Sequence, residues 1–167
     1  MTSKESRNHL IEIALKEVGY TEGARNDNKY AGLAGHANNL PWCASFVSAM
    51  FKKAELPKAL LNSASCQAIE KWAKEKDLVI PLAEAKRGDV VLMDFSNSGV
   101  SQHIGLALSR YNPERKNIHT IEGNTGDKSQ TNGDGVYLKT RGAKFIRCVI
   151  RPRFPKDKEN GVENGTV

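Results

Sequence analysis

The chain has 167 residues, and its three cysteines and four histidines could support nucleophilic chemistry. Cys43 lies in the segment Leu40-Pro41-Trp42-Cys43-Ala44-Ser45-Phe46-Val47, where a helix is predicted to begin. A thiol in the first turn of a helix meets the positive end of the helix dipole and unpaired N–H groups, which favour the thiolate. The same N–H groups can stabilise the oxyanion formed when a thiolate attacks an amide carbonyl. The sequence therefore predicts a nucleophile at Cys43, and the alternative is a core thiol beneath Trp42.

The other two cysteines look like packing residues. Cys66 falls inside a predicted helix, and Cys148 falls on a predicted strand between basic and apolar neighbours. An odd number of cysteines without close pairs is not typical of a disulfide framework or a zinc site. We therefore expect reduced thiols and no metal.

A thiolate nucleophile needs a base that forms an ion pair with it and then protonates the leaving amine. His103 opens a predicted strand after the polar turn Ser96-Asn97-Ser98-Gly99, where its side chain is expected at the mouth of a cleft. His9 lies on the first predicted helix without a polar cluster, and His119 lies inside a strand. His36 lies in a long loop, where it could touch a substrate but has no fixed framework. We therefore predict that His103 is the base.

The base in turn needs a polar group that orients its ring. Glu122 ends the next predicted strand, and Asn124 follows it. If strands 103–108 and 118–122 are adjacent and antiparallel, the start of one lies beside the end of the other, which places Glu122 next to His103. Asn124 could hold the same ring or a substrate. The alternative for Glu122-Gly123-Asn124 is a simple strand end and its turn.

The elements that must position these residues follow from hydrophobic periodicity. Helices are predicted at 6–18, 41–54 and 63–76, the last one capped by Ser63 or Ser65, with a long loop at 19–41 that holds a short turn near 29–31. Strands are predicted at 89–93, 103–108, 118–122, 135–138 and 145–150, arranged as an antiparallel meander. Helices followed by strands are typical of an α+β fold, here one domain over residues 1–154. The polar tail 155–167 is predicted to be disordered.

Composition and charge limit the function classes. Hydrophobic residues make up 39% and charged residues 26%, as in ordinary globular proteins. No apolar run approaches the roughly 20 residues that a membrane-spanning helix requires. The polar N-terminus lacks the features of a signal peptide, so we expect synthesis in a cytoplasm. The net charge of +6 is compatible with nucleic acid, an anionic wall polymer or a membrane surface as partner.

The order of these motifs resembles the CHAP family, the cysteine- and histidine-dependent amidohydrolases/peptidases of the papain-like superfamily. The resemblance covers residues 8–152 and rests on Pro41-Trp42-Cys43-Ala44-x-Phe46-Val47, Gly88-Asp89-Val90-Val91, His103-Ile104-Gly105 and Ile121-Glu122-Gly123-Asn124. It implies N-terminal helices packed against a C-terminal antiparallel sheet of about five to six strands. It also implies Cys43 as nucleophile, His103 as base, Glu122 as orienting acid and Asn124 as an additional polar residue.

The same resemblance implies a substrate, which is bacterial peptidoglycan. The bond cut is either the N-acetylmuramoyl–L-alanine amide or one within the stem peptide or cross-bridge. The segment Asn26-Asp27-Asn28-Lys29-Tyr30 is similar to the approach to the nucleophile in this family, so Asn28, Tyr30 and Trp42 are the expected substrate-binding residues. Some members bind calcium through closely spaced aspartates before the nucleophile. Only Asp27 lies in that loop here, which does not favour calcium, and no other cofactor is implied.

A small, basic chain without a signal peptide or an appended wall-binding domain looks most like a single-domain bacteriophage endolysin, which acts as a monomer after holin-dependent release. Two rivals are a wall amidase toxin delivered by a secretion system and a catalytically inactive wall-binding module. A nucleic-acid binder is suggested by the charge alone, because no basic run or aromatic-basic motif supports it.

Overall fold

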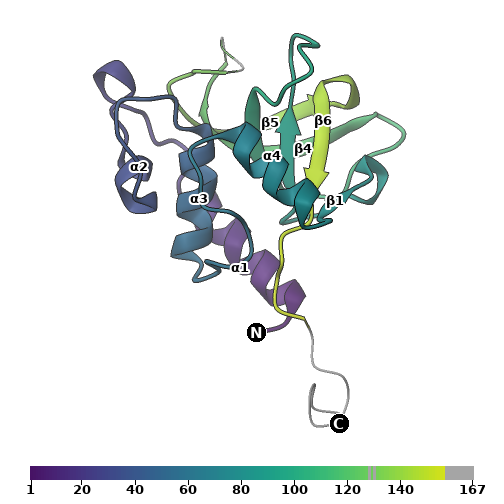
Figure 1. Ribbon diagram of the computed structural model, residues 1–167. Helices are drawn as coiled ribbons and strands as arrows, with labels where there is room; N and C mark the ends of the chain where they lie inside the picture. Colours follow the sequence, from purple (N-terminus) through teal and green to yellow (C-terminus); the bar gives the residue numbers. More distant parts are fainter. Residues whose placement is uncertain (128, 130, 157–167) are drawn as a thin grey trace.

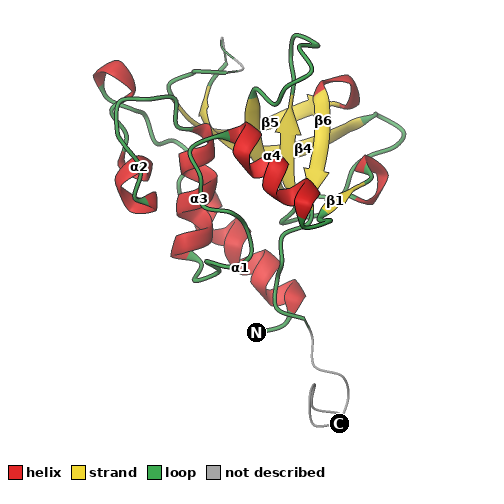
Figure 2. Ribbon diagram, viewed as in Figure 1, coloured by secondary structure: helices red, strands yellow, loops and turns green. Residues whose placement is uncertain are grey.

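The computed structural model describes residues 1–127, 129 and 131–156, which form an α+β structure. Over these residues it has four α-helices: α1 (Ser3–Leu15), α2 (Lys29–Ala34), α3 (Cys43–Lys53) and α4 (Cys66–Glu75). The six strands are β1 (Val79–Ile80), β2 (Val90–Met93), β3 (His103–Ala107), β4 (Asn117–Thr125), β5 (Gly135–Gly142) and β6 (Ile146–Ile150). Helices α1, α2 and α3 lie beside the sheet, and α4 lies in front of it in the view of Figure 2. The predicted α+β class is confirmed.

All strand pairs in the sheet are antiparallel, and the strand order is β1-β6-β2-β3-β4-β5. Strands β2 to β5 form the predicted meander. The prediction was wrong for β6, which crosses back to pair with β2, so that Val91 lies opposite Val149. The two-residue strand β1 was missed because it is too short to show an alternating pattern.

The helix boundaries differ from the prediction at both ends of α1. The helix begins at Ser3 because Thr2 and Glu5 form a capping box, and its C-cap is Lys16. Val18 therefore lies beyond the helix, where it is exposed. The predicted loop 19–41 contains the 3₁₀ turn Ala24–Asn26 and the helix α2. Ser65 caps α4 by accepting a hydrogen bond from the Ala68 N–H.

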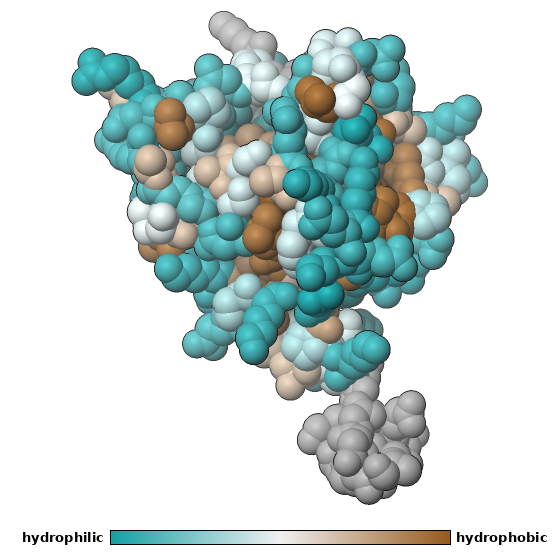
Figure 3. Space-filling model, viewed as in Figure 1, coloured by the Kyte–Doolittle hydropathy of each residue, from teal (hydrophilic) through white to brown (hydrophobic). Residues whose placement is uncertain are grey.

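The main core lies between the helices and one face of the sheet. Val90 and Leu92 of β2 belong to it, whereas the alternating residues Val91 and Met93 belong to a smaller cluster on the other face. Figure 1 shows α1, α2 and α3 gathered on one side of the sheet. The drawn face of the molecule is mainly hydrophilic, with apolar side chains in small separate groups (Figure 3).

Gly123 of β4 lets α3 approach the sheet closely. A Cβ atom added at Gly123 would lie 2.6 Å from Phe46 Cβ and 2.7 Å from the Trp42 ring. The start of α3, and with it Cys43, is therefore seated directly on the strand that carries Glu122.

No described helix has the length and apolar character needed to cross a membrane. From residue 157 onward, the predicted disordered tail lies outside the described residues.

Candidate active site

Cys43 is the first residue of α3, as predicted within two residues. Its side chain is buried, and 8% of the residue remains exposed. Several groups act on its sulfur. The Cys66 thiol is the strongest of them, and together with His103 and the Ala44 N–H it lowers the pKa of Cys43 well below its ordinary value, although burial opposes this shift. Cys43 therefore carries the environment of a thiolate nucleophile.

His103 is the first residue of β3 and is completely buried. The sequence predicted a side chain at the mouth of a cleft. That prediction was wrong, because the Phe95 ring packs 6.1 Å from the imidazole, and Glu122 lies against the imidazole as well. Burial by itself would lower the pKa of His103, but the charges of Cys43 and Glu122 raise it to about 9. The ring is therefore held as an imidazolium at neutral pH.

Glu122 orients this ring. Its Oε1 atom lies 2.8 Å from Nε2 of His103, which confirms the predicted proximity of the two side chains, while their catalytic roles stay predictions. The carboxylate lies over Gly105 of the neighbouring strand, where an added Cβ would approach Glu122 Cγ to 2.6 Å. Because Nε2 is engaged by Glu122, Nδ1 is the nitrogen left for the reacting groups. Within the described part of the chain, Nδ1 has no hydrogen-bond partner of normal geometry.

Arg141 of β5 completes the buried charge network. Its Nε donates to Glu122 Oε2 at 2.8 Å, and its Nη2 donates to Oε1 at 2.5 Å. Thr120 also donates to Oε2 at 2.5 Å. Burial would raise the pKa of Glu122, but Arg141 and His103 lower it to about 2. Glu122 therefore stays ionised and can hold the imidazolium.

Arg141 was not among the predicted site residues because the predicted strand ended at residue 138, whereas β5 continues to Gly142. With the full strand, the register pairs Ile118 with Arg141 and Glu122 with Tyr137. An arginine within an alternating strand segment was the signal that could have found it.

Asn124 lies near the end of β4 with a left-handed backbone, φ 56°, and is 1% exposed. Its backbone carbonyl accepts a hydrogen bond from the Gly133 N–H at 2.8 Å. Its Oδ1 atom has no hydrogen-bond partner among the described residues. Glu122 therefore makes the contact with His103, whereas Asn124 has a buried amide oxygen near the end of the same strand, and its role stays a prediction.

Trp42, Tyr30 and Asn28, the expected substrate-binding residues, are buried. Trp42 and Tyr30 stack with centroids 5.3 Å apart, and the indole N–H of Trp42 donates to Glu22 at 2.8 Å. Asn28 caps α2 by accepting a hydrogen bond from the Ala31 N–H at 2.9 Å. These side chains present almost no surface in this structure, with Asn28 5% exposed and both aromatic side chains fully buried, and their role in substrate binding stays a prediction. They hold the start of α3 in place.

Cys66 was predicted to lie inside a helix as a packing residue. It is instead the first residue of α4, and its Sγ lies 3.7 Å from Sγ of Cys43. The starts of two helices therefore meet at the candidate nucleophile. His36 also differs from expectation, since it is held between Ser45, at 2.8 Å, and Asn62.

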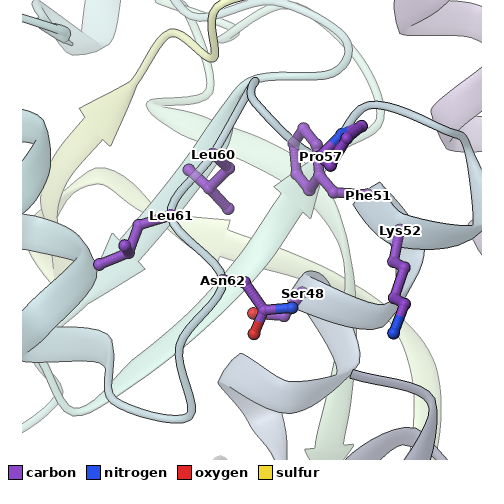
Figure 4. Close-up of a pocket in the computed structure, with 7 residues that line it drawn as sticks. All are labelled: Ser48, Phe51, Lys52, Pro57, Leu60, Leu61 and Asn62. Atoms are coloured by element: carbon purple, nitrogen blue, oxygen red, sulfur yellow. The ribbon is translucent and has the colours of Figure 1, made fainter. Parts of the chain in front are cut away.

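The pocket in Figure 4 is not part of this site. It has a volume of about 160 Å³ and lies between the later turns of α3 and the segment 57–62, with Ser48, Phe51 and Leu60 in its lining. Drug-sized ligand sites are usually about 300 Å³ or larger. Among the described residues, no group of three or more histidine, cysteine or acidic side chains could hold a metal ion.

No protein-family model and no curated protein matches the chain. The activity must therefore be inferred from the side chains of the site. A thiolate beside an imidazolium, which is itself held by an ionised carboxylate, is a set of groups suited to nucleophilic attack on an acyl carbon.

Proposed function

We propose that this protein is a cysteine-dependent hydrolase that cleaves amide bonds in bacterial peptidoglycan. The observation that carries the proposal is the set Cys43, His103 and Glu122, drawn from a helix start and two adjacent strands, with Glu122 clamped by Arg141. Such a connected arrangement with strongly shifted pKa values is more typical of an active site than of a structural core.

The substrate class and the assignment to the papain-like CHAP fold are part of the same proposal. The motifs around Cys43, His103 and Glu122 resemble the CHAP family in their order along the chain. A helical half seated on an antiparallel sheet, with the candidate nucleophile at a helix start, is compatible with the papain-like CHAP fold. The net charge of +6 favours approach to an anionic bacterial wall. A bacteriophage endolysin, released to the wall through the membrane, is the setting that we propose.

The chemistry follows from the positions of these groups. The Cys43 thiolate attacks the carbonyl carbon of the amide, and the N–H groups of the first turn of α3, that of Ala44 among them, stabilise the oxyanion. The imidazolium of His103 gives its proton to the leaving amine as the C–N bond breaks. Water then attacks the thioester, His103 takes its proton, and the acid product leaves as the thiolate is restored. Glu122 keeps the ring oriented in both steps.

The test is digestion of purified sacculi by the full chain, with release of new amino groups as the readout. The variant Cys43→Ala should abolish release while circular dichroism shows a retained fold. The variant Cys148→Ala is the matched control, because Cys148 is a half-buried thiol on β6 and should leave release unchanged. If Cys43→Ala released amino groups at the rate of the unmodified protein, the proposal would be wrong.

The same experiment separates the rivals. A wall-binding module would sediment with sacculi without releasing amino groups. Mass analysis of the fragments would show whether the N-acetylmuramoyl–L-alanine amide or a peptide bond is cut. A secretion-system toxin shares the chemistry and would be distinguished by a paired immunity protein.

A further inference from the structure

The second thiol at the candidate nucleophile sits in a fixed position. Cys66 Sγ lies 3.7 Å from Cys43 Sγ, a separation at which one thiol can donate a hydrogen bond to the other sulfur. Ser65 fixes the start of α4 by accepting from the Ala68 N–H at 3.1 Å, and Ile69 and Ala73 anchor the helix in the core. The direction from which Cys66 reaches Cys43 is therefore set by the packing of α4.

The two thiols differ in their surroundings. Cys43 is influenced by His103 from β3 and by the Ala44 N–H, both of which favour the thiolate. The hydrogen bond with Cys43 raises the pKa of Cys66 far above its ordinary value, with burial acting in the same direction. Cys43 therefore loses its proton first, and Cys66 remains the donor.

The other charged groups of the site lie on the side of His103. Glu122 from β4 contacts the ring of His103, and Arg141 from β5 contacts Glu122. Cys66 approaches the sulfur from a different element, α4. Its contribution can therefore be removed without touching the His103–Glu122–Arg141 network.

We propose that Cys66 is a positioning residue for Cys43: its S–H donates to the Cys43 sulfur, stabilises the thiolate and fixes the direction in which that sulfur points. This proposal depends on the proposed function only for the identity of the substrate that the thiolate attacks. Hydrogen bonds to ionised groups are stronger than those between neutral groups, although sulfur is a weak donor. Loss of this bond should reduce the thiolate population of Cys43 about tenfold at pH values below its titration.

The test is the rate at which iodoacetamide alkylates Cys43, followed by peptide-resolved mass spectrometry from roughly pH 4 to pH 9. This small reagent can use the exposed fraction of Cys43, and it requires no hydrolase activity. The variant Cys66→Ala removes the donor and Cys66→Ser replaces it with a hydroxyl. Should the alanine variant fail to fold, Cys66→Val removes the donor and leaves no cavity. Cys148→Ala is the control.

We expect the alkylation of Cys43, at pH values below its titration, to fall about tenfold in Cys66→Ala or Cys66→Val and to recover in Cys66→Ser. Superimposable pH curves for the unmodified protein and folded Cys66→Ala would overturn the proposal. So would equal losses in the serine and alanine variants, since these would indicate packing alone. If sacculi are not cleaved but the alkylation shift appears, the proposed function fails while the role of Cys66 stands.

Discussion

Nε2 of His103 lies 2.8 Å from Oε1 of Glu122, and both side chains are completely buried. The pair joins two neighbouring strands at the end of the sheet where α3 begins. Because the ring nitrogen that faces Glu122 is occupied, the other nitrogen is available for proton transfer at the candidate nucleophile. The ionised carboxylate also favours the charged form of the ring.

The substitution Glu122→Gln tests this relationship. It keeps the shape of the side chain but removes the charge, so the imidazolium loses its stabilisation and the ring its orientation. We expect kcat for sacculus hydrolysis to fall about a hundredfold or more. The alkaline limb of the pH profile should also move to lower pH. An unchanged alkaline limb would show that Glu122 does not act on His103.

The pH dependence of the rate should be bell-shaped. On the acid side, activity is lost as the Cys43 thiolate is protonated. On the alkaline side, it is lost as His103 releases its proton, at a pKa of about 9. The two limbs belong to the coupled pair rather than to either residue alone. Initial rates on a soluble peptidoglycan fragment would measure them, and a rate rising beyond the pKa of His103 would contradict the assignment.

Stability should depend on pH through the same groups. The pKa of Glu122 is lowered from 4.5 to about 2, so its stabilising contribution is complete above pH 4.5 and is lost as the pH falls toward about 2. The pKa of His103 is raised from 6.5 to about 9, so its contribution is complete below pH 6.5 and is lost as the pH rises toward about 9. Urea unfolding across the pH range would measure both. In Glu122→Gln, the loss of unfolding free energy at acid pH should be smaller than in the unmodified protein.

Arg141 should contribute to stability as well as to the site. Arg141→Met leaves the buried Glu122 carboxylate without its bidentate hydrogen-bond donor, which should cost about 3 kcal/mol of unfolding free energy. The control is Arg147→Met. It removes the ion pair between Arg147, whose side chain is 28% exposed, and Glu70. Glu70 keeps Lys74 at 2.6 Å, so the control should cost about 1 kcal/mol or less. Equal costs in urea unfolding would argue against a special role for Arg141.

Gly105 provides the space for the carboxylate of Glu122. Gly105→Ala places a Cβ 2.6 Å from Glu122 Cγ and 3.1 Å from the Ile121 carbonyl oxygen, so Glu122 must shift from the position in which it contacts His103. We expect a larger loss of activity than of stability, measured as kcat and as unfolding free energy. The control Gly32→Ala lies in α2 with open space around its Cβ and should leave activity unchanged. Full activity of Gly105→Ala would show that Glu122 tolerates displacement.

The two thiols should also be cross-linked by mild oxidation. Diamide removes two electrons and two protons from Cys43 and Cys66 and is itself reduced to the hydrazine. The sulfurs need to close from 3.7 Å to a disulfide bond of about 2.05 Å. Mass spectrometry should find the cross-linked peptide, and dithiothreitol should restore alkylation of Cys43. Cys66→Ser should show no cross-linked Cys43, and a disulfide between Cys43 and another cysteine in that variant would place the partner elsewhere.

Much of the fold and three members of the candidate site could be predicted from the sequence, because they depend on local patterns and on neighbouring strands. The helix start at Cys43 follows from a short apolar stripe after Pro41. The proximity of His103 and Glu122 follows from the antiparallel pairing of consecutive strands. Such relationships need only the periodicity of each element and the order in which the elements occur.

The tertiary structure alone decided which other residues meet them. Arg141 reaches Glu122 because β5 continues to Gly142, beyond the predicted end at residue 138, and the register then sets its position. Cys66 reaches Cys43 because α4 packs with its first residue against the start of α3, a relationship that no local pattern encodes. Burial of Trp42 and the return of β6 to β2 likewise depend on how whole elements fill the core. The sequence therefore determined the candidate nucleophile and its candidate base, and side-chain packing determined the groups that lie against them.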